Sequence, residues 1–374
     1  MKKKLGLLTA GSDCPGLNAA VRAIGKEVKA TLGMEVVAFQ DGFQGLVEDR
    51  IFPIDDTSFS GILATGGTIL GTSRDRPQRL FVAGKGDIDG TENALQTIEK
   101  HHLEGLVCIG GKETQETAYY LMGKGVNVIT LPKAIDNDIA ATETTIGFAT
   151  ALETAMESID RLHSTALSHH RILIVELMGR NSGWLTLGAG MAGGADVIII
   201  PEIPYNAEKI AEAISVRTHA RKNFSIIAVA ENIIPQEYVS FFGRLESANA
   251  RIRVGRERES VSGQIQGFKN QYRGSTAYLA NRLEKFTGLE TRVAILGYIL
   301  RGGAPSAGDR LLATQLGTAC ISLVADHQYG VMVGIHQGLP VPVPLKQVVG
   351  VPKPVPINHP WILSARRVGT CFGE

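Results

Sequence analysis

Cysteine is scarce in this sequence and follows no ligand pattern. The four cysteines are scattered along the chain, and no two of them stand at the short spacing typical of a zinc site. A small secreted domain stabilised by disulfides usually has far more cysteine for its length. We therefore expect reduced thiols and a cytoplasmic protein.

Long apolar runs and an excess of charge of either sign are also missing. No stretch approaches the roughly 20 apolar residues that span a bilayer. The apolar segment behind the basic N-terminus ends at Gly11 and Asp13, too early for a signal peptide. The formal net charge is only +1, so nothing draws the whole chain toward nucleic acid or anionic lipid. We expect neither a membrane nor a nucleic-acid partner.

The sequence does contain two series of short apolar runs that alternate with helical patterns. Such runs, rich in β-branched residues, predict parallel strands that are buried on both faces of a sheet. A helical pattern near residues 148–163 separates the two series. The expected strands are 4–9, 35–39, 105–109 and 126–130 in the first series, and 171–176, 196–200 and 225–230 in the second.

We predict an α/β fold of two Rossmann-like domains with parallel-rich sheets and an active site in the cleft between them. The first domain is expected to comprise residues 1–148 with about 300–345, and the second residues 149–299 with about 346–374. The polar segment 233–274, which carries Arg251, Arg253, Arg256 and Arg258, is expected on the surface. An effector-phosphate site and a solvated loop both remain open for it. The proline-rich tail 339–360 should run extended over the surface.

Glycine is the marked excess, with 43 residues, and it gathers where predicted strands end. Ligands of open α/β sheets collect beyond the carboxyl ends of the strands. A helix that opens there presents free N–H groups that suit a phosphate, and arginines there match the fork geometry of a phosphate monoester. The polar segments at such ends are 10–13, 66–74, 110–114 and 132–138 in the first half, and 178–180, Glu231 and 296–303 in the second.

Four of these motifs resemble the bacterial phosphofructokinases. They are Asp-Cys-Pro-Gly-Leu-Asn-Ala (13–19), Ile-Asp-Asn-Asp (135–138), Met-Gly-Arg (178–180) and Arg-Gly-Gly (301–303), and the resemblance runs in unbroken order from about residue 4 to 335. The segment 233–274 and the tail are similar to the longer branch of that family, whose members use ATP or pyrophosphate. The resemblance implies phosphoryl transfer to the 1-hydroxyl of fructose 6-phosphate, giving fructose 1,6-bisphosphate, with Mg²⁺ as cofactor.

The resemblance also assigns roles to single residues. Asp136 would be the general base that takes the proton from the sugar hydroxyl, and Asp138 would lie beside it and help hold the metal. Arg171 and Arg292 would reach the site of a neighbouring subunit, which implies a homodimer or a homotetramer. The implied catalytic set is Asp136, Asp138, Lys133 and Arg180.

The two domains would divide the ligands between them, with the donor in the first and the sugar phosphate in the second. The residues implied around the sugar phosphate are Ala134, Ile135, Arg171, Met178, Gly179, Arg180, Glu231, Arg292, Tyr298 and Arg301. Those implied around the donor are Gly11, Ser12, Arg74, Asp75, Gly111, Lys112, Glu113 and Thr114.

The sequence departs from the family pattern mainly on the donor side. Lys112 stands where the family carries an aspartate that helps hold magnesium, and an ammonium group cannot be a metal ligand. Glu113 and Lys133 follow the pattern of the pyrophosphate users, and Glu113 would direct negative charge toward a nucleotide α-phosphate. Ser12 replaces a glycine beside the nucleotide, Ala134 replaces a threonine near the sugar, and Tyr298 replaces a histidine common in the ATP branch.

Three functions are compatible with these departures. The chain could be an active enzyme with a pyrophosphate-like donor site in which lysines partly replace the metal's charge. It could be an active ATP-dependent enzyme, or a catalytically impaired regulatory homologue that binds sugar phosphate. Sugar-binding proteins of the periplasmic type and oxidoreductases are disfavoured, because an export signal and a Gly-x-Gly-x-x-Gly turn after the first strand are both missing.

Overall fold

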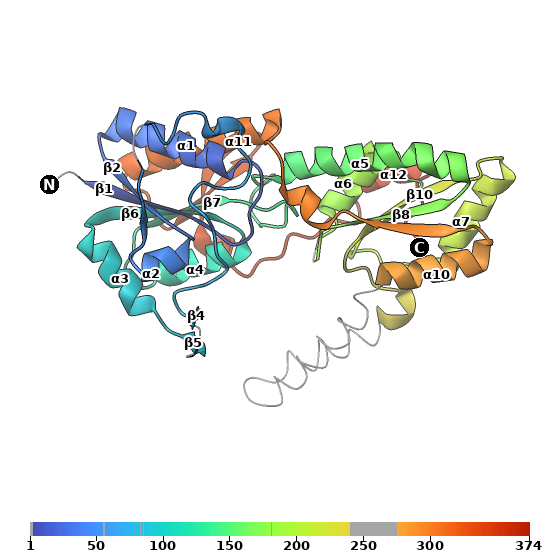
Figure 1. The fold of residues 1–374 in the computed structure, drawn as a ribbon, viewed down its shortest axis with the longest axis horizontal. Coiled ribbons are helices and arrows are strands. Elements are labelled where there is room, and N and C mark those ends of the chain that lie inside the picture. Colours follow the sequence, from blue (N-terminus) through green and yellow to red (C-terminus); the bar gives the residue numbers. More distant parts are fainter. Residues whose placement is uncertain (1–2, 55–56, 83, 85, 181, 240–274) are drawn as a thin grey trace. The chain divides into compact units, whose positions relative to one another are not determined.

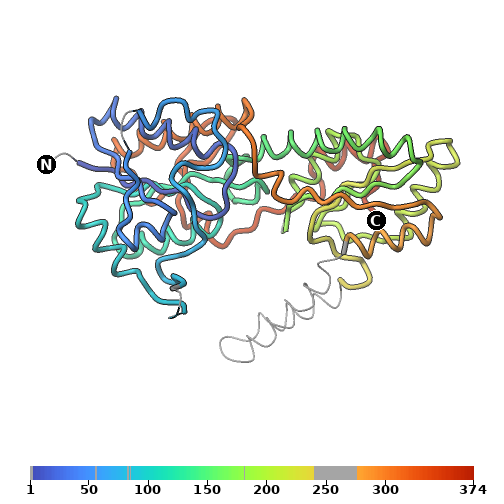
Figure 2. Tube along the Cα trace, viewed as in Figure 1, coloured from blue at the N-terminus to red at the C-terminus, as the bar shows by residue number. Residues whose placement is uncertain are grey.

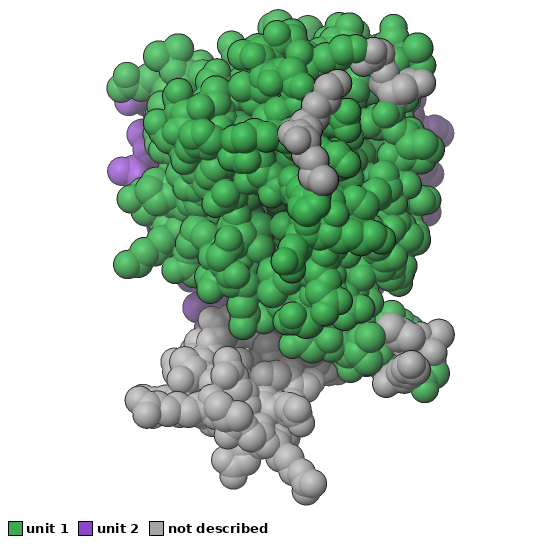
Figure 3. Space-filling model, turned by 90° about the vertical axis from the view of Figure 1, so that its left-hand side faces the viewer, with its two compact units in different colours: residues 1–151, 301–353 green, residues 152–300, 354–374 purple. Residues whose placement is uncertain are grey.

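The computed structural model describes residues 3–54, 57–82, 84, 86–180, 182–239 and 275–374. The chain forms two compact units, coloured separately in Figure 3: unit 1 is Met1–Ala151 with Arg301–Lys353, and unit 2 is Leu152–Leu300 with Pro354–Glu374. Each unit contains a mainly parallel sheet with helices, which confirms the predicted fold class. The arginines at 251, 253, 256 and 258 lie outside the described residues. Which ligand each unit binds stays a prediction.

Unit 1 is built on a seven-stranded sheet in the order β13-β12-β7-β6-β1-β2-β3. Its neighbouring strands are parallel except for the antiparallel pairs β2–β3 and β12–β13. The strands are β1 Lys4–Ala10, β2 Glu35–Phe39, β3 Ile51–Phe52, β6 Leu103–Gly110, β7 Val128–Pro132, β12 Val331–His336 and β13 Leu339–Pro344. A separate hairpin consists of β4 Leu80–Val82 and β5 Gly86–Ile88.

Helices cover both faces of this sheet, as expected for parallel strands with continuous apolar sequences. Helices α1 and α11 lie on one face, and α2, α3 and α4 lie on the other (Figure 1). The helices are α1 Leu17–Glu27, α2 Phe43–Val47, α3 Thr91–Lys100, α4 Lys112–Met122 and α11 Ala307–Ala325. Single turns complete the unit at η1 Val28–Leu32, η2 Ile62–Ala64 and η5 Leu345–Gln347.

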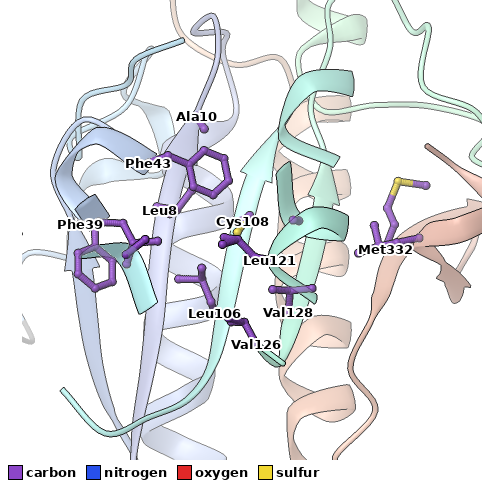
Figure 4. Close-up of a cluster of buried hydrophobic side chains, with 14 of the residues drawn as sticks. Leu8, Ala10, Phe39, Phe43, Leu106, Cys108, Leu121, Val126, Val128 and Met332 are labelled. Atoms are coloured by element: carbon purple, nitrogen blue, oxygen red, sulfur yellow. The ribbon is translucent and has the colours of Figure 1, made fainter. Parts of the chain in front are cut away.

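The core of unit 1 fixes the register of the central strands. Leu8 of β1, Leu106 of β6 and Val128 of β7 are buried in one cluster, and Leu121 of α4 packs against it (Figure 4). Burial of each such side chain contributes about 1.5–3 kcal/mol. The register then pairs Ala10 with Gly110 and Gly110 with Pro132, so three neighbouring strands end level with one another.

Unit 2 is built on a four-stranded, fully parallel sheet in the order β11-β8-β10-β9. Helices α5, α6 and α12 lie on one face, and α7 and α10 lie on the other (Figures 1 and 2). The strands are β8 Ile172–Leu177, β9 Val197–Ile199, β10 Ser225–Ala230 and β11 Thr291–Ile295. The helices are α5 Phe148–His169, α6 Trp184–Ala192, α7 Ala207–His219, α10 Ser275–Thr287 and α12 Pro360–Arg367, with single turns η3 Gln236–Tyr238 and η4 Gly297–Arg301.

The proline-rich tail is extended only in part. Its first portion is β13, an antiparallel edge strand on β12, in which Pro340, Pro342 and Pro344 recur at every second position. An edge strand tolerates proline because one side of its backbone needs no ladder hydrogen bond. Leu345 and Val348 then enter the core of unit 1, so the expectation of a surface run is wrong there. Among the described residues, no helix has both the length and the apolar character needed to cross a membrane.

Candidate active site

Three loops of unit 1 meet because the strands that precede them end level. They follow β1, β6 and β7, which are neighbours in the sheet, and they begin at Gly11, Gly111 and Lys133. Parallel strands direct their carboxyl ends to the same edge, where ligands of open α/β sheets bind. The structure thus brings together the donor-side segments that were predicted separately from the sequence.

The loop after β1 is held by the segment that follows Gly71. Gly11 donates its N–H to the carbonyl of Ser73 at 2.8 Å, and the Thr72 hydroxyl donates to the carbonyl of Gly11 at 2.7 Å. Arg74 Nη2 donates to the hydroxyl of Ser12 at 3.1 Å. Gly11 has a φ of 83°, a left-handed conformation that would strain any residue with a Cβ, and a Cβ there would lie in ordinary contact with Lys133 Nζ at 3.6 Å.

Lys133 places a buried cation at the centre of these loops. Its side chain is 3 % exposed, and its ammonium group donates to the carbonyl of Ser12. Burial lowers the pKa of Lys133, because removal from water disfavours the charged form. A bound anion would stabilise the charged form again. This lysine therefore suits a ligand with a high negative charge.

Lys112 and Asp138 form an ion pair across the loops after β6 and β7. The Nζ of Lys112 lies 2.7 Å from Oδ2 of Asp138, and the side chains are 33 % and 16 % exposed. Lys112 begins α4 next to Gly111, so its ammonium adds to the positive end of that helix. Among the described residues, no three His, Cys, Asp or Glu side chains are grouped as a metal site would require. The ammonium occupies the position of a cation beside Asp138, so these residues do not fit a magnesium ion.

A small hollow beside the loop after β1 contains most of the remaining donor-side residues. Arg76 Nη2 lies 3.4 Å from Oε1 of Glu113, and its Nη1 donates to Glu116 at 3.1 Å. The Thr114 hydroxyl donates to the carbonyl of Ala10 at 3.5 Å, which ties α4 to the end of β1. The hollow is lined by Ala10, Gly11, Phe43, Ser73, Arg74, Asp75, Arg76, Glu113, Thr114 and Thr117.

The predicted catalytic aspartates lie on a tight turn after β7. Between them, Asn137 has a left-handed φ of 49° and donates its N–H to the carbonyl of Ala134 at 3.3 Å. Asparagine is one of the few residues that adopt this conformation readily. Asp136 and Asp138 thus stand on either side of one turn, with Ala134 and Ile135 directly before it.

Arg301 adds another cation to unit 1. Its Nη1 donates to the carbonyl of Asp13 at 3.2 Å. Its Nε is buried and makes no hydrogen bond within the described part of the chain. A guanidinium group with a spare donor suits the oxygen of a phosphate group. Arg301, predicted on the sugar side, therefore lies beside the loop that was predicted to bind the donor.

In unit 2, the predicted sugar-phosphate residues follow three neighbouring strands. Met178, Gly179 and Arg180 follow β8, Glu231 follows β10, and Tyr298 follows β11. Gly179 has a φ of 143°, and a Cβ there would lie 2.7 Å from the carbonyl oxygen of Ser182, so this turn requires glycine. Arg180 Nε lies 3.6 Å from Oε1 of Glu231.

Arg171 and Arg292 lie elsewhere in unit 2, at the amino ends of β8 and β11. Both pair with Glu290, and the Nε of Arg171 lies 2.5 Å from its Oε2. At the usual rise per residue, the carboxyl end of β8 is about 20 Å from Arg171, and the carboxyl end of β11 is about 10 Å from Arg292. The structure therefore does not bring these arginines together with Met178, Arg180 and Tyr298 of the same subunit.

Two charged residues at the site were not predicted from the sequence. Arg76 pairs with Glu113 and Glu116, and Lys353 hydrogen-bonds the turn between the aspartates. Arg76 follows Arg74 by two positions, so its place in the same loop could have been used to predict a second cation there. Lys353 stands in the proline-rich tail, far from every motif in the sequence, and only the fold brings it to the turn.

Comparison with known proteins identifies the family. The phosphofructokinase family model matches residues 4–324. The chain is 49 % identical over 381 residues to an ATP-dependent 6-phosphofructokinase of Propionibacterium freudenreichii subsp. shermanii, covering 100 % of both chains. It is 43 % identical over 375 residues to an ATP-dependent 6-phosphofructokinase of Spirochaeta thermophila, covering 100 % of this chain and 98 % of the relative.

Solved structures agree on the fold. The phosphofructokinase of Pichia pastoris in its T-state superposes with a TM-score of 0.73 and 28 % identity, covering 93 % of this chain and 35 % of the yeast chain. A pyrophosphate-dependent phosphofructokinase of Marinobacter aquaeolei superposes with a TM-score of 0.76 over 100 % of this chain and 92 % of that one. At 19 % identity, the second likeness shows the fold alone. The loops at the strand ends, the family match and the full-length relatives agree that this chain belongs to the phosphofructokinase family.

Proposed function

We propose that this protein is a 6-phosphofructokinase that transfers a phosphoryl group to the 1-hydroxyl of fructose 6-phosphate. Relatives 41–49 % identical over nearly their full length carry that activity in their names. The observation that supports the chemistry here is the turn with Asp136 and Asp138 beside the buried ammonium of Lys133. A base and an anion site at one sheet edge are the parts that phosphoryl transfer needs.

The mechanism follows from the charges of unit 1. Asp136 accepts the proton of the 1-hydroxyl as the sugar oxygen attacks the terminal phosphorus of the donor in line. Lys133 and Arg74 hold the donor oxygens, and their positive charge offsets the charge that accumulates on the equatorial oxygens and on the leaving group. The departing phosphate remains bound to the same cations until it is released.

The sugar phosphate is proposed to bind unit 2 through the residues at the ends of β8, β10 and β11. Met178, Gly179 and Arg180 form a turn of restricted shape, and Glu231 orients Arg180. Arg171 and Arg292 are proposed to serve the site of a neighbouring subunit in a homodimer or homotetramer, because they lie at the opposite ends of these strands.

We propose pyrophosphate as the phosphoryl donor. Glu113 lines the hollow with Arg74, and the family resemblance implies that its carboxylate would stand near the α-phosphate of a nucleotide. Like charges in such contact are repelled. Lys133, a buried cation, suits the compact and highly charged pyrophosphate. ATP remains the alternative that the names of the full-length relatives favour.

No step of this mechanism is assigned to magnesium held at the Lys112–Asp138 pair, because the ammonium fills that position. We propose that the charge of Lys112 supports the turn that carries the base.

The experiment is an assay of fructose 1,6-bisphosphate formation from fructose 6-phosphate and either donor, with and without a chelator. We expect turnover with pyrophosphate, a kcat/KM with ATP at least about 100-fold lower, and turnover with pyrophosphate that persists in chelator. Asp136→Asn is the negative control and should lose about 10²–10⁴-fold in kcat. Preference for ATP would overturn the donor proposal alone. Absence of product with both donors, together with binding of fructose 6-phosphate, would favour the regulatory homologue.

A further inference from the structure

The turn that carries both aspartates is braced by a residue from the distant C-terminal tail. Lys353 Nζ donates to Oδ1 of Asn137 at 2.9 Å and to the carbonyl of Glu143 at 3.0 Å. Asn137 in turn donates its Nδ2 to the same Glu143 carbonyl at 3.1 Å. The ammonium therefore closes a ring of hydrogen bonds with the residue between Asp136 and Asp138.

The tail backbone is attached at the same place. Pro352 forms a β-bridge with Ile139, so the residue before Lys353 pairs with the residue after Asp138. Ile139 is fully buried, which anchors the bridge in the core of unit 1. Lys353 is thus placed by backbone pairing as well as by its own hydrogen bonds.

The charges around Asp138 and Glu143 suit a cation from the tail. Burial lowers the pKa of Lys353 to about 8, and the negative charges of Asp138 and Glu143 oppose that effect. Asp138 also pairs with Lys112 of α4 at 2.7 Å. Asp138 therefore lies in the field of ammonium groups from two elements that are remote in sequence.

We propose that Lys353 is a positioning residue for phosphoryl transfer, which fixes the Asp136–Asp138 turn from the C-terminal tail. It contacts no proposed substrate atom and acts through Asn137. The backbone of Asn137 is left-handed, with a φ of 49°, a conformation that persists only where its surroundings stabilise it. Without the ammonium, the turn has other conformations available, and Asp136 loses the geometry that in-line attack requires.

This inference rests on the proposed function, and steady-state kinetics test it. For Lys353→Met we expect kcat to fall by about 100-fold, as is typical of a small misplacement of a catalytic group. The KM for fructose 6-phosphate should stay within about threefold, because the sugar phosphate is bound by unit 2. Lys353→Arg keeps the charge and several donors and should retain at least about tenfold more kcat than the methionine variant.

The matched control is Lys346→Met, which removes an exposed lysine from the same tail and should leave kcat unchanged. A kcat for Lys353→Met within about twofold of the native value overturns the proposal. Equal losses in kcat for the arginine and methionine variants overturn it as well. A rise in KM that accounts for the whole loss would assign Lys353 to substrate binding instead, and also overturns it.

Amide hydrogen exchange separates this proposal from the proposed function. The N–H of Asn137 and the neighbouring amides of residues 134–146 should exchange faster in Lys353→Met than in the native protein and in Lys346→Met. If the native protein shows no turnover, faster exchange still supports the bracing role, whereas the proposed function fails. Unchanged exchange in this segment overturns the bracing role whatever the activity.

Discussion

At the scale of single residues, Lys112 determines the sign of the charge that lies beside Asp138. Its ammonium is 2.7 Å from Asp138, where an aspartate at position 112 would instead create a pair of carboxylates. Paired carboxylates are the usual protein ligands of Mg²⁺ beside phosphate groups. An aspartate at position 112 would therefore replace the ammonium group of the protein with a site that must bind a metal ion.

We predict that Lys112→Asp makes turnover depend on magnesium. In chelator, the variant should lose about 10²–10³-fold in kcat, because two close carboxylates repel and one charge-stabilising group is gone. Added Mg²⁺ should restore a large part of that loss, which a titration of kcat with free Mg²⁺ measures. Lys112→Met is the control, since it removes the ammonium without adding a ligand. Equal responses of the two variants to Mg²⁺ would contradict the prediction.

The lowered pKa of Lys353 predicts that kcat and the free energy of unfolding change in opposite directions as the pH rises. Burial lowers its pKa from the usual 10.5 to about 8, against the opposing effect of Asp138 and Glu143. As the pH rises through about 8, Lys353 loses its proton and its charge, so kcat should fall. Between about 8 and 10.5 the unfolded chain holds more protons on this residue, so its contribution to the free energy of unfolding rises with pH.

Lys353→Arg should show neither trend, because a guanidinium stays charged over this range. The measurements are kcat between pH 6.5 and 9.5 and urea denaturation at pH 8 and pH 10, each for the native protein and the arginine variant. Identical pH profiles of kcat in the two proteins would show that another group controls the alkaline side.

The role of a single residue was easiest to predict from the sequence where the chemistry of its side chain allows only one conclusion. A lysine in place of a metal-binding aspartate excludes a ligand at that position, whatever the fold. The sequence alone did not predict the ion pair of Lys112 with Asp138, because this contact depends on where α4 begins relative to the turn after β7. The role of Lys353 was not predictable for the same reason, because the bridge between Pro352 and Ile139 determines which residues it contacts.

At the scale of elements, Asp309 joins helix α11 to the start of the long helix α5. It is fully buried on α11, and its Oδ1 accepts the N–H of Gly147 at 2.8 Å. Its Oδ2 accepts the N–H of Thr150 at 2.8 Å and the Thr150 hydroxyl at 2.5 Å. A carboxylate at the first turn of a helix also interacts favourably with the helix dipole.

We predict that Asp309→Ala lowers the free energy of unfolding by about 3–5 kcal/mol, since several buried donors lose their acceptor. Asp309→Asn keeps one acceptor oxygen and should cost about half as much. Ser306→Ala removes only the N-cap of α11 and should cost about 1 kcal/mol. Urea denaturation measures all three. A loss for Asp309→Ala no larger than that for Ser306→Ala would contradict the assigned role.

Elements were predictable from sequence where the apolar period was clear. The expected strands at 35–39 and 225–230 coincide with β2 and β10, because continuous β-branched runs have few other stable arrangements in a covered sheet. The structure of the proline-rich tail was harder to predict from the sequence. Its prolines indicated an extended chain, but β13 joins the sheet because β12 offers a free edge, and a free edge is a property of the assembled fold.

At the scale of the whole molecule, the arginines at the amino ends of β8 and β11 bear on assembly. The Met178–Arg180 turn and Tyr298 follow the opposite ends of the same strands. A phosphate bound at those carboxyl ends is about 20 Å from Arg171 along β8 and about 10 Å from Arg292 along β11, and both arginines are paired with Glu290 in their own subunit. Arg171 is therefore out of reach of such a phosphate in its own subunit, and we expect both arginines to act at the site of a neighbouring subunit.

We predict that two inactive variants restore activity when their subunits are mixed. Asp136→Asn lacks the base but keeps Arg292, and Arg292→Ala lacks the arginine but keeps the base. In a dimer with reciprocal sites, each hybrid contains one site with both native groups, so an equimolar random mixture should regain about a quarter of native activity. The measurement is kcat after joint unfolding and refolding, with each variant refolded alone as the control. Activity that stays at the sum of the separate variants would show that Arg292 acts within its own subunit or not at all.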